Sequence, residues 1–172
     1  MREMRRAKQQ LTRQECEEIL ATGSFGVLAL LGDEGCTYAV PSNYVYANGA
    51  VYFHGAPKGH KMDSVRRTPR ASFCVVVKNT PVPELLAADF RSATAFGPLA
   101  VVDDPDEKRR ALFALQEKYA PGEREAAAKE IEESLGYVAV IRLTPEVLTG
   151  KMALEEVRVK AAETAKMREG KA

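Results

Sequence analysis

A basic turn within residues 51–70 (VYFHGAPKGHKMDSVRRTPR) has the composition of an anion-binding site. The strand pattern ends at His54, a glycine-containing loop follows, and a helix is predicted to begin near His60. The first N–H groups of a helix have no partner within the helix, so they can donate to an anion. Lys58 and Lys61 add positive charge there, which opposes the helix dipole unless an anion binds. A solvated basic loop is the alternative, and this turn alone leaves both interpretations open.

A second stretch, residues 38–46 (YAVPSNYVY), predicts an interrupted strand at a sheet edge. Pro41 has no N–H to donate to a ladder, so it favours an edge or a break in the pairing. The freed main-chain groups of Ser42 and Asn43 could then contact a flat heterocycle with alternating donors and acceptors. The alternative is an irregular edge strand that binds nothing.

A third stretch, residues 90–97 (FRSATAFG), places the small hydroxylated side chains of Ser92 and Thr94 between alanines. This pattern suits a close-packed interface between subunits, or a contact to a polyhydroxylated part of a ligand. Both interpretations remain open from the residues alone.

Several familiar kinds of site are excluded. The sequence has no Gly-Lys-Ser/Thr phosphate loop, no G-x-G-x-x-G after a strand and no G-x-S-x-G elbow. With only His54 and His60, a histidine-rich metal site is not expected, and no metal is predicted. A Cys–His catalytic pair stays open, although nothing in the sequence positions one.

The elements that must position these stretches are mostly strands that pair locally. Thr12 with Glu15 predicts a capped helix that Gly23 ends, and Asp104 with Pro105 predicts the start of another. Further helices are predicted over residues 60–67 and 123–135. Strands are predicted at residues 25–31, 37–46, 50–54, 71–78, 90–102, 137–143 and 147–152, with one hairpin over 37–54, a loop over 79–84 and a bend at 97–98. A doubly wound fold is excluded, and a mainly antiparallel barrel with peripheral helices fits best.

The composition is that of one globular domain of 172 residues, 45% apolar and 28% charged. A net charge of +1 gives no field that would attract nucleic acid or a membrane, and neither is an expected partner. No apolar run is long enough to span a bilayer, and no secretory signal is expected. Three widely spaced cysteines indicate a reducing cytoplasm, with Cys74 expected in the core. Residues 1–153 are predicted as the domain, and residues 154–172 as a charged tail, helical or disordered.

Taken together, these stretches resemble the FMN-binding split-barrel family related to pyridoxamine 5′-phosphate oxidase. The nearest branch is the nitroimidazole-resistance (nitroimidazole reductase-like) group. The resemblance covers roughly residues 5–152. The motifs that carry it are VPSNYVY (40–46), the Asn48-Gly49 turn, VYFHGAPKGHKMD (51–63), RRTPRASFCVV (66–76), FRSATAFG (90–97) and LTGK (148–151).

The resemblance implies a six-stranded antiparallel split β-barrel and a homodimer with two FMN sites at the subunit interface. Residues along the isoalloxazine would be Val40, Pro41, Ser42, Asn43 and Tyr44. The residues around the phosphate end would be His54, Lys58, His60 and Lys61. Ser92 would belong to the strand that lines the site, either in the same subunit or from the partner subunit, and Lys151 would lie near the cofactor.

The activity implied is that of an FMN-dependent oxidoreductase acting on a small organic substrate such as a nitroaromatic compound. No catalytic side chain is assigned, because the flavin supplies the electron chemistry. The alternative is a non-catalytic flavin- or haem-binding carrier or sensor with the same fold, and a deazaflavin is a further possible ligand. The sequence lacks the arginine-rich phosphate signature and the C-terminal substrate segment of the pyridoxamine-phosphate oxidases proper.

Overall fold

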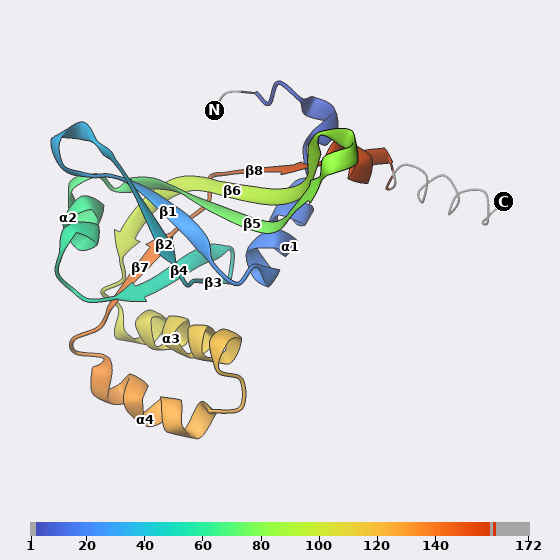
Figure 1. Cartoon of the computed structure of the whole chain (residues 1–172). Helices are drawn as coiled ribbons and strands as arrows, with labels where there is room; N and C mark the ends of the chain where they lie inside the picture. Colours follow the sequence, from blue (N-terminus) through green and yellow to red (C-terminus); the bar gives the residue numbers. More distant parts are fainter. Residues whose placement is uncertain (1–2, 159, 161–172) are drawn as a thin grey trace.

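The computed structural model describes residues 3–158 and 160, and it shows a mainly antiparallel sheet with peripheral helices. The sheet wraps around a barrel-like core, and a pair of helices forms a separate layer at one end of it (Figure 1). The predicted fold class is confirmed. The strand count differs, because the sheet is open and has eight strands instead of six.

The strands are β1 (Gly26–Leu31), β2 (Thr37–Ser42), β3 (Val45–Ala47), β4 (Ala50–Gly55), β5 (Arg70–Val82), β6 (Ala87–Val101), β7 (Ala139–Leu143) and β8 (Val147–Met152). The helices are α1 (Arg13–Thr22), α2 (His60–Arg67), α3 (Pro105–Tyr119) and α4 (Arg124–Ser134), with short 3-10 turns at η1 (Ala7–Gln9), η2 (Asp33–Gly35) and η3 (Pro83–Leu85).

The predicted helix starts are confirmed by their caps. Thr12 accepts from the Glu15 N–H while the Glu15 carboxylate accepts from the Thr12 N–H, which is a complete capping box for α1. The Asp104 carboxylate accepts from two N–H groups of the first turn of α3, and Pro105 occupies its first position. Local sequence chemistry therefore fixes where these helices begin.

The barrel is split between two strands that are neighbours in the sequence. The hydrogen-bonded order is β2-β1-β5-β6-β7-β4-β3, with β8 paired to β6, so β2 and β3 are the two ends. The single hairpin predicted over residues 37–54 is therefore wrong. Within residues 37–54, the hairpin is limited to β3 and β4, around Asn48 and Gly49, both at positive φ. β2 instead pairs with β1 along all six of its residues, and that pairing holds Pro41 at the sheet edge, as predicted.

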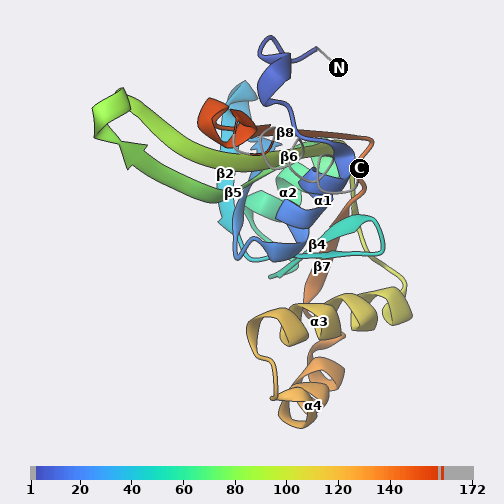
Figure 2. The same cartoon turned by 90° about the vertical axis from the view of Figure 1, so that its right-hand side faces the viewer.

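The loop predicted over residues 79–84 is also wrong, because β5 continues to Val82 and pairs with β6 as far as Ala87. Beyond its short pairing with β1, this part of β5 has β6 as its partner and leaves its other edge open. A proline such as Pro81 is tolerated where its missing N–H faces an open edge. β5 and β6 therefore form a long arm that projects from the barrel (Figure 2).

Two apolar cores stabilise this arrangement. The barrel core contains large, fully buried side chains such as Phe53, Phe73 and Ile141. A second core, which includes Leu112 and Ile131, lies between α3, α4 and the strands β3, β4 and β7. Cys74 is only half-buried, contrary to expectation, whereas Cys16 is fully buried.

The C-terminal end of the described chain is helical from residue 154 to 158. The predicted charged tail from residue 161 onward lies outside the described residues. Among residues 3–158 and 160, none of the helices combines the length and apolar composition that a membrane crossing requires.

Gly97 marks the point where β6 changes partner from β8 to β7. A Cβ added there would lie 1.9 Å from the Thr144 carbonyl oxygen, so the backbone must shift to admit it. We expect Gly97→Ala to lower the free energy of unfolding by ~1–3 kcal/mol or more, as measured by urea denaturation. Gly136→Ala is the matched control, because its Cβ would have no atom within 4 Å. Equal losses in the two variants would contradict this account.

Candidate functional site

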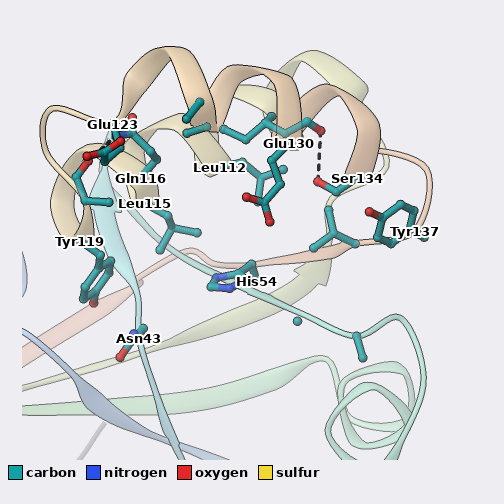
Figure 3. Close-up of a pocket in the computed structure, with 17 residues that line it drawn as sticks. Asn43, His54, Leu112, Leu115, Gln116, Tyr119, Glu123, Glu130, Ser134 and Tyr137 are labelled. Atoms are coloured by element: carbon teal, nitrogen blue, oxygen red, sulfur yellow. Dashed lines mark hydrogen bonds between the residues drawn. The ribbon is translucent and has the colours of Figure 1, made fainter.

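A cavity of about 720 Å³ lies between one end of the barrel and the α3–α4 layer (Figure 3). Asn43 and His54 line it from the barrel side, and both were selected from the sequence. Leu112 and Leu115 of α3 and Ile131 of α4 give the opposite wall its apolar surface. The volume and the mostly apolar lining are typical of small-molecule sites.

Tyr119, at the end of α3, joins this layer to the split in the barrel. The Tyr44 N–H donates to Tyr119 Oη at 2.9 Å. The Tyr119 hydroxyl in turn lies 2.7 Å from the Ser24 carbonyl oxygen and 2.9 Å from that of Tyr44. One hydroxyl therefore satisfies main-chain groups that no strand pairs with. The sequence indicated only an apolar helix face at Tyr119, because its partners are about 75 or more residues away.

Glu107, near the start of α3, makes the second attachment to the sheet. Its carboxylate accepts from the Tyr52 hydroxyl of β4 at 2.9 Å and from Arg142 of β7 at 2.7 Å. Because α3 is tied at both ends, its apolar face is held at a fixed distance from β4. The cavity is the space that remains between them beside His54.

Lys61 carries a positive charge beside this cavity, next to the lining residues His54 and Gly55. Its Nζ lies 3.5 Å from the main-chain oxygen of His54, and the side chain is half-buried. Within the part of the chain that the structure describes, no carboxylate pairs with Lys61. Burial lowers the pKa of Lys61, while burial and then the charge of Lys61 lower the pKa of His54. The pKa shift of His54 includes the effect of the nearby Lys61 charge, which a bound anion would offset.

Lys61 belongs to the first turn of α2. The N-cap of this helix is Gly59, at φ 105°, and no side chain caps the first turn. Lys58 is exposed on the preceding loop. By contrast, Arg67 at the other end of the helix is neutralised by Asp33 at 2.8 Å. The uncompensated charge is thus concentrated at the N-terminal end of α2, where the sequence predicted anion binding.

His60 lies apart from the cavity. Its ring stacks on Tyr38 with centroids 4.1 Å apart and an interplanar angle of 12°. Its Nε2 is 3.5 Å from Asp33 Oδ2 in η2. His60 therefore connects α2 to the β1–β2 turn, and its proposed contact with a phosphate stays a prediction.

The remaining predicted residues are distributed along strands. Val40 packs on the barrel core, Pro41 is exposed on β2, and the Ser42 hydroxyl lies 3.4 Å from the Val40 oxygen. Tyr44 is fully buried, with its ring against Phe73. None of these four lines the cavity.

Ser92 and Lys151 face each other across the β6–β8 pair, away from the cavity lining. Lys151 Nζ lies 5.4 Å from the centre of the Phe90 ring. A single chain thus brings together Asn43, His54 and Lys61, and the contribution of the β2 and β8 residues stays a prediction.

The fold agrees with a known family. The family model described as pyridoxamine 5′-phosphate oxidase matches residues 12–152, which is most of the chain. The chain belongs to this family. The resemblance inferred from the sequence motifs is therefore confirmed, and the open sheet is a form of the family's split barrel. A search of curated proteins gave no match to the sequence.

Solved structures of three family-like proteins show the same fold. The conserved protein Rv2991 from Mycobacterium tuberculosis is 18% identical with a TM-score of 0.76, covering 87% of this chain and 90% of that one. A candidate 5-nitroimidazole antibiotic resistance protein from Bacteroides thetaiotaomicron is 23% identical with a TM-score of 0.68, covering 83% and 86%. An FAD and haem binding protein from Mycobacterium smegmatis is 21% identical with a TM-score of 0.70, covering 85% and 74%.

The coupling between His54 and Lys61 can be measured by NMR titration of the His54 ring. We expect a pKa below 6.5 in the native protein and a higher value in Lys61→Met, because one cause of the depression is removed. The value should stay below 6.5, since burial is the larger cause. Because the pKa of His54 is lower in the folded chain than in the unfolded chain, protonation of His54 favours the unfolded chain. The free energy of unfolding should therefore decrease as the pH falls from about 6.5 through the folded pKa.

Lys58→Met removes a neighbouring lysine of the same turn and is the control for this titration. It should leave the His54 curve unchanged, because Lys61 is the charge that acts on His54. If Lys61→Met left the His54 pKa at its native value, the electrostatic description of this corner would be incorrect.

Proposed function

We propose that the protein is an FMN-binding flavoprotein and an oxidoreductase that reduces a small organic substrate, such as a nitroaromatic compound. The observation that carries the proposal is the half-buried, unneutralised Lys61 at the start of α2, beside a largely apolar cavity. A phosphate satisfies the charge and the free N–H groups, and the adjoining apolar cavity suits a small organic substrate. Membership of the family supports the same assignment.

The residues present fit a flavin mononucleotide. Lys58, Lys61 and the first N–H groups of α2 would hold its single phosphate, and residues 40–44, which include the end of the edge strand β2, would lie along the ring system. When bound, the flavin supplies the transfer of electrons to the substrate. His54 and Asn43 would orient the substrate, and the leucines of α3 would exclude water from it.

A homodimer is part of the proposal. Ser92 and Lys151 lie outside the cavity lining of their own chain, and we propose that they contribute to the cofactor site of a second copy. The tip of the β5–β6 arm supports such contact, because Leu85 and Leu86 are 58% and 97% exposed there. The three cysteines are unpaired, which is consistent with the cytoplasmic location that we also propose.

The phosphate assignment predicts a difference between FMN and riboflavin, which lacks the phosphate. Lys61→Glu should weaken FMN binding by ~2 kcal/mol, about 30-fold, because a charge-assisted contact becomes a repulsion. Riboflavin binding should change far less. Quenching of flavin fluorescence gives both dissociation constants.

Lys129→Glu is the control for this charge reversal, because Lys129 is 82% exposed on α4 and lies away from the turn. It should leave both affinities at their native values. An unchanged FMN affinity in Lys61→Glu, or an equal loss for riboflavin, would disprove the proposed role of Lys61.

Haem binding is the second candidate function, and the observation that favours it is the imidazole of His54 beside an apolar cavity. If the chain is a haem carrier, titration with haemin should give a Soret band that His54→Ala abolishes and His60→Ala retains, because His60 is stacked on Tyr38 elsewhere. A Soret band that survives in His54→Ala would remove His54 as an axial ligand. A flavin spectrum that persists in His54→Ala would support the leading proposal.

A further inference from the structure

A lysine next to Tyr119 also joins the end of α3 to the barrel. Lys118 Nζ lies 3.8 Å from the centre of the Tyr44 ring, above its face, and 5.5 Å from the centre of the Tyr119 ring. The nitrogen is shielded from solvent, and within residues 3–158 and 160 it has no hydrogen-bond acceptor. The face of an aromatic ring therefore replaces part of the water around this ammonium group.

The ring contact offsets only part of the cost of removing the Lys118 charge from water. Burial lowers the pKa of Lys118 to about 8. The pKa of a hydrated lysine is ~10.4, so Lys118 holds its proton more weakly when α3 lies against the barrel than when it is exposed. By linkage, protonation of Lys118 favours separation of the end of α3 from the barrel, and loss of the proton favours contact.

The tyrosines that surround Lys118 stay uncharged near neutral pH. Burial raises the pKa of both Tyr44 and Tyr119, whose rings face the ammonium group. Other titratable groups on the neighbouring segments are Tyr46 of β3, whose pKa is also raised, Glu17 of α1 and Glu123 before α4. In the part of the chain that the structure describes, none of these forms a hydrogen bond with Lys118, and burial is the cause of its pKa shift. Lys118 is therefore the group in this contact whose charge changes as the pH rises from neutral to alkaline.

The Lys118 contact acts on the same barrel residue as the Tyr119 hydrogen bond. Tyr44 donates its N–H to Tyr119 Oη at 2.9 Å, and the ring of Tyr44 carries Lys118. Tyr119 also lines the cavity and extends from α3 toward Asn43 (Figure 3). Separation at Tyr44 would therefore move a wall of the cavity.

We propose that Lys118, Tyr119 and Tyr44 form a pH-dependent clasp between α3 and the split in the barrel. When Lys118 is protonated, the end of α3 separates more often from Tyr44, and the cavity opens to ligands on that side. When Lys118 is neutral, α3 stays in contact with the barrel and the cavity is closed there. The clasp does not depend on which cofactor or substrate the protein binds.

The Tyr44 N–H reports the state of the clasp, because it is bonded to the Tyr119 hydroxyl. Its exchange with solvent is measured by NMR on the full chain and divided by the intrinsic rate at each pH, which gives a protection factor. We expect this factor to be ~3–10-fold higher at about pH 9 than at about pH 6.5. A pKa of about 8 in the closed state and ~10.4 in the open state sets the upper value.

Two replacements of Lys118 should change this response in opposite ways. Lys118→Met removes the charge and keeps an apolar stem, so protection at about pH 6.5 should rise toward the native value at about pH 9. Lys118→Arg stays charged at both pH values, so protection should stay low at both. Lys129→Met, which removes an exposed lysine of α4, is the control and should keep the native response.

Tyr119→Phe shows whether the Tyr44 N–H is a valid reporter, because it removes the hydroxyl that accepts from this amide. Its protection should be low at both pH values. A pH response that persists in Lys118→Met would assign the switch to another group. The absence of a response in the native chain, or a native response in Lys118→Arg, would show that the charge of Lys118 does not control the clasp. Any of these three results would overturn the proposal.

Discussion

The split between β2 and β3 is the constraint on which the rest of the structure depends. The two strands are neighbours in the sequence but end the sheet on opposite sides, so the main chain at Tyr44 has no ladder partner there. A buried N–H without a partner is costly, and the Tyr119 hydroxyl provides that partner from α3. Satisfying the barrel backbone therefore requires α3 to lie over the barrel end, and the cavity beside His54 follows from that position.

The charged forms of Lys61 and His54 destabilise the folded chain, and other contacts of α2 offset this cost. Burial disfavours the charged forms of Lys61 and His54, and the charge of Lys61 disfavours the charged form of His54 further, which destabilises the folded state in the absence of an anion. The helix is nevertheless held in place, because His60 stacks on Tyr38 and Arg67 pairs with Asp33. The anchoring groups of α2 contact η2 and Tyr38, whereas the uncompensated Lys61 lies beside His54. A site that is strained when empty gains more from binding its anion.

Sequence reasoning succeeded where structure is set by local chemistry. The caps at Thr12 and Asp104, the turn at Asn48-Gly49 and the bounds of α2 each depend on a few adjacent residues. It failed where pairing between distant residues determines the structure. β2 pairs with β1 rather than with β4, and β5 continues through Pro81 into the long β5–β6 arm. The site divides in the same way. Local motifs identified Asn43, His54 and Lys61, but no local signal reveals that α3 and α4 complete the cavity.

The barrel wall and the α4 wall of the cavity are held in place by different interactions. The barrel wall belongs to a continuous ladder, with β4 paired to β7 from Val51 to Gly55. α4 is attached to α3 through Arg109–Glu132 and a bond from Lys108 to the Leu135 oxygen, together with the apolar contacts of Ile131. Exposed ion pairs contribute ~0–1 kcal/mol each, so the apolar contacts of the buried Ile131 hold α4 in place more than its ion pairs do. The barrel wall is thus fixed by hydrogen-bonded strands, whereas side-chain packing on α3 sets the position of the α4 wall.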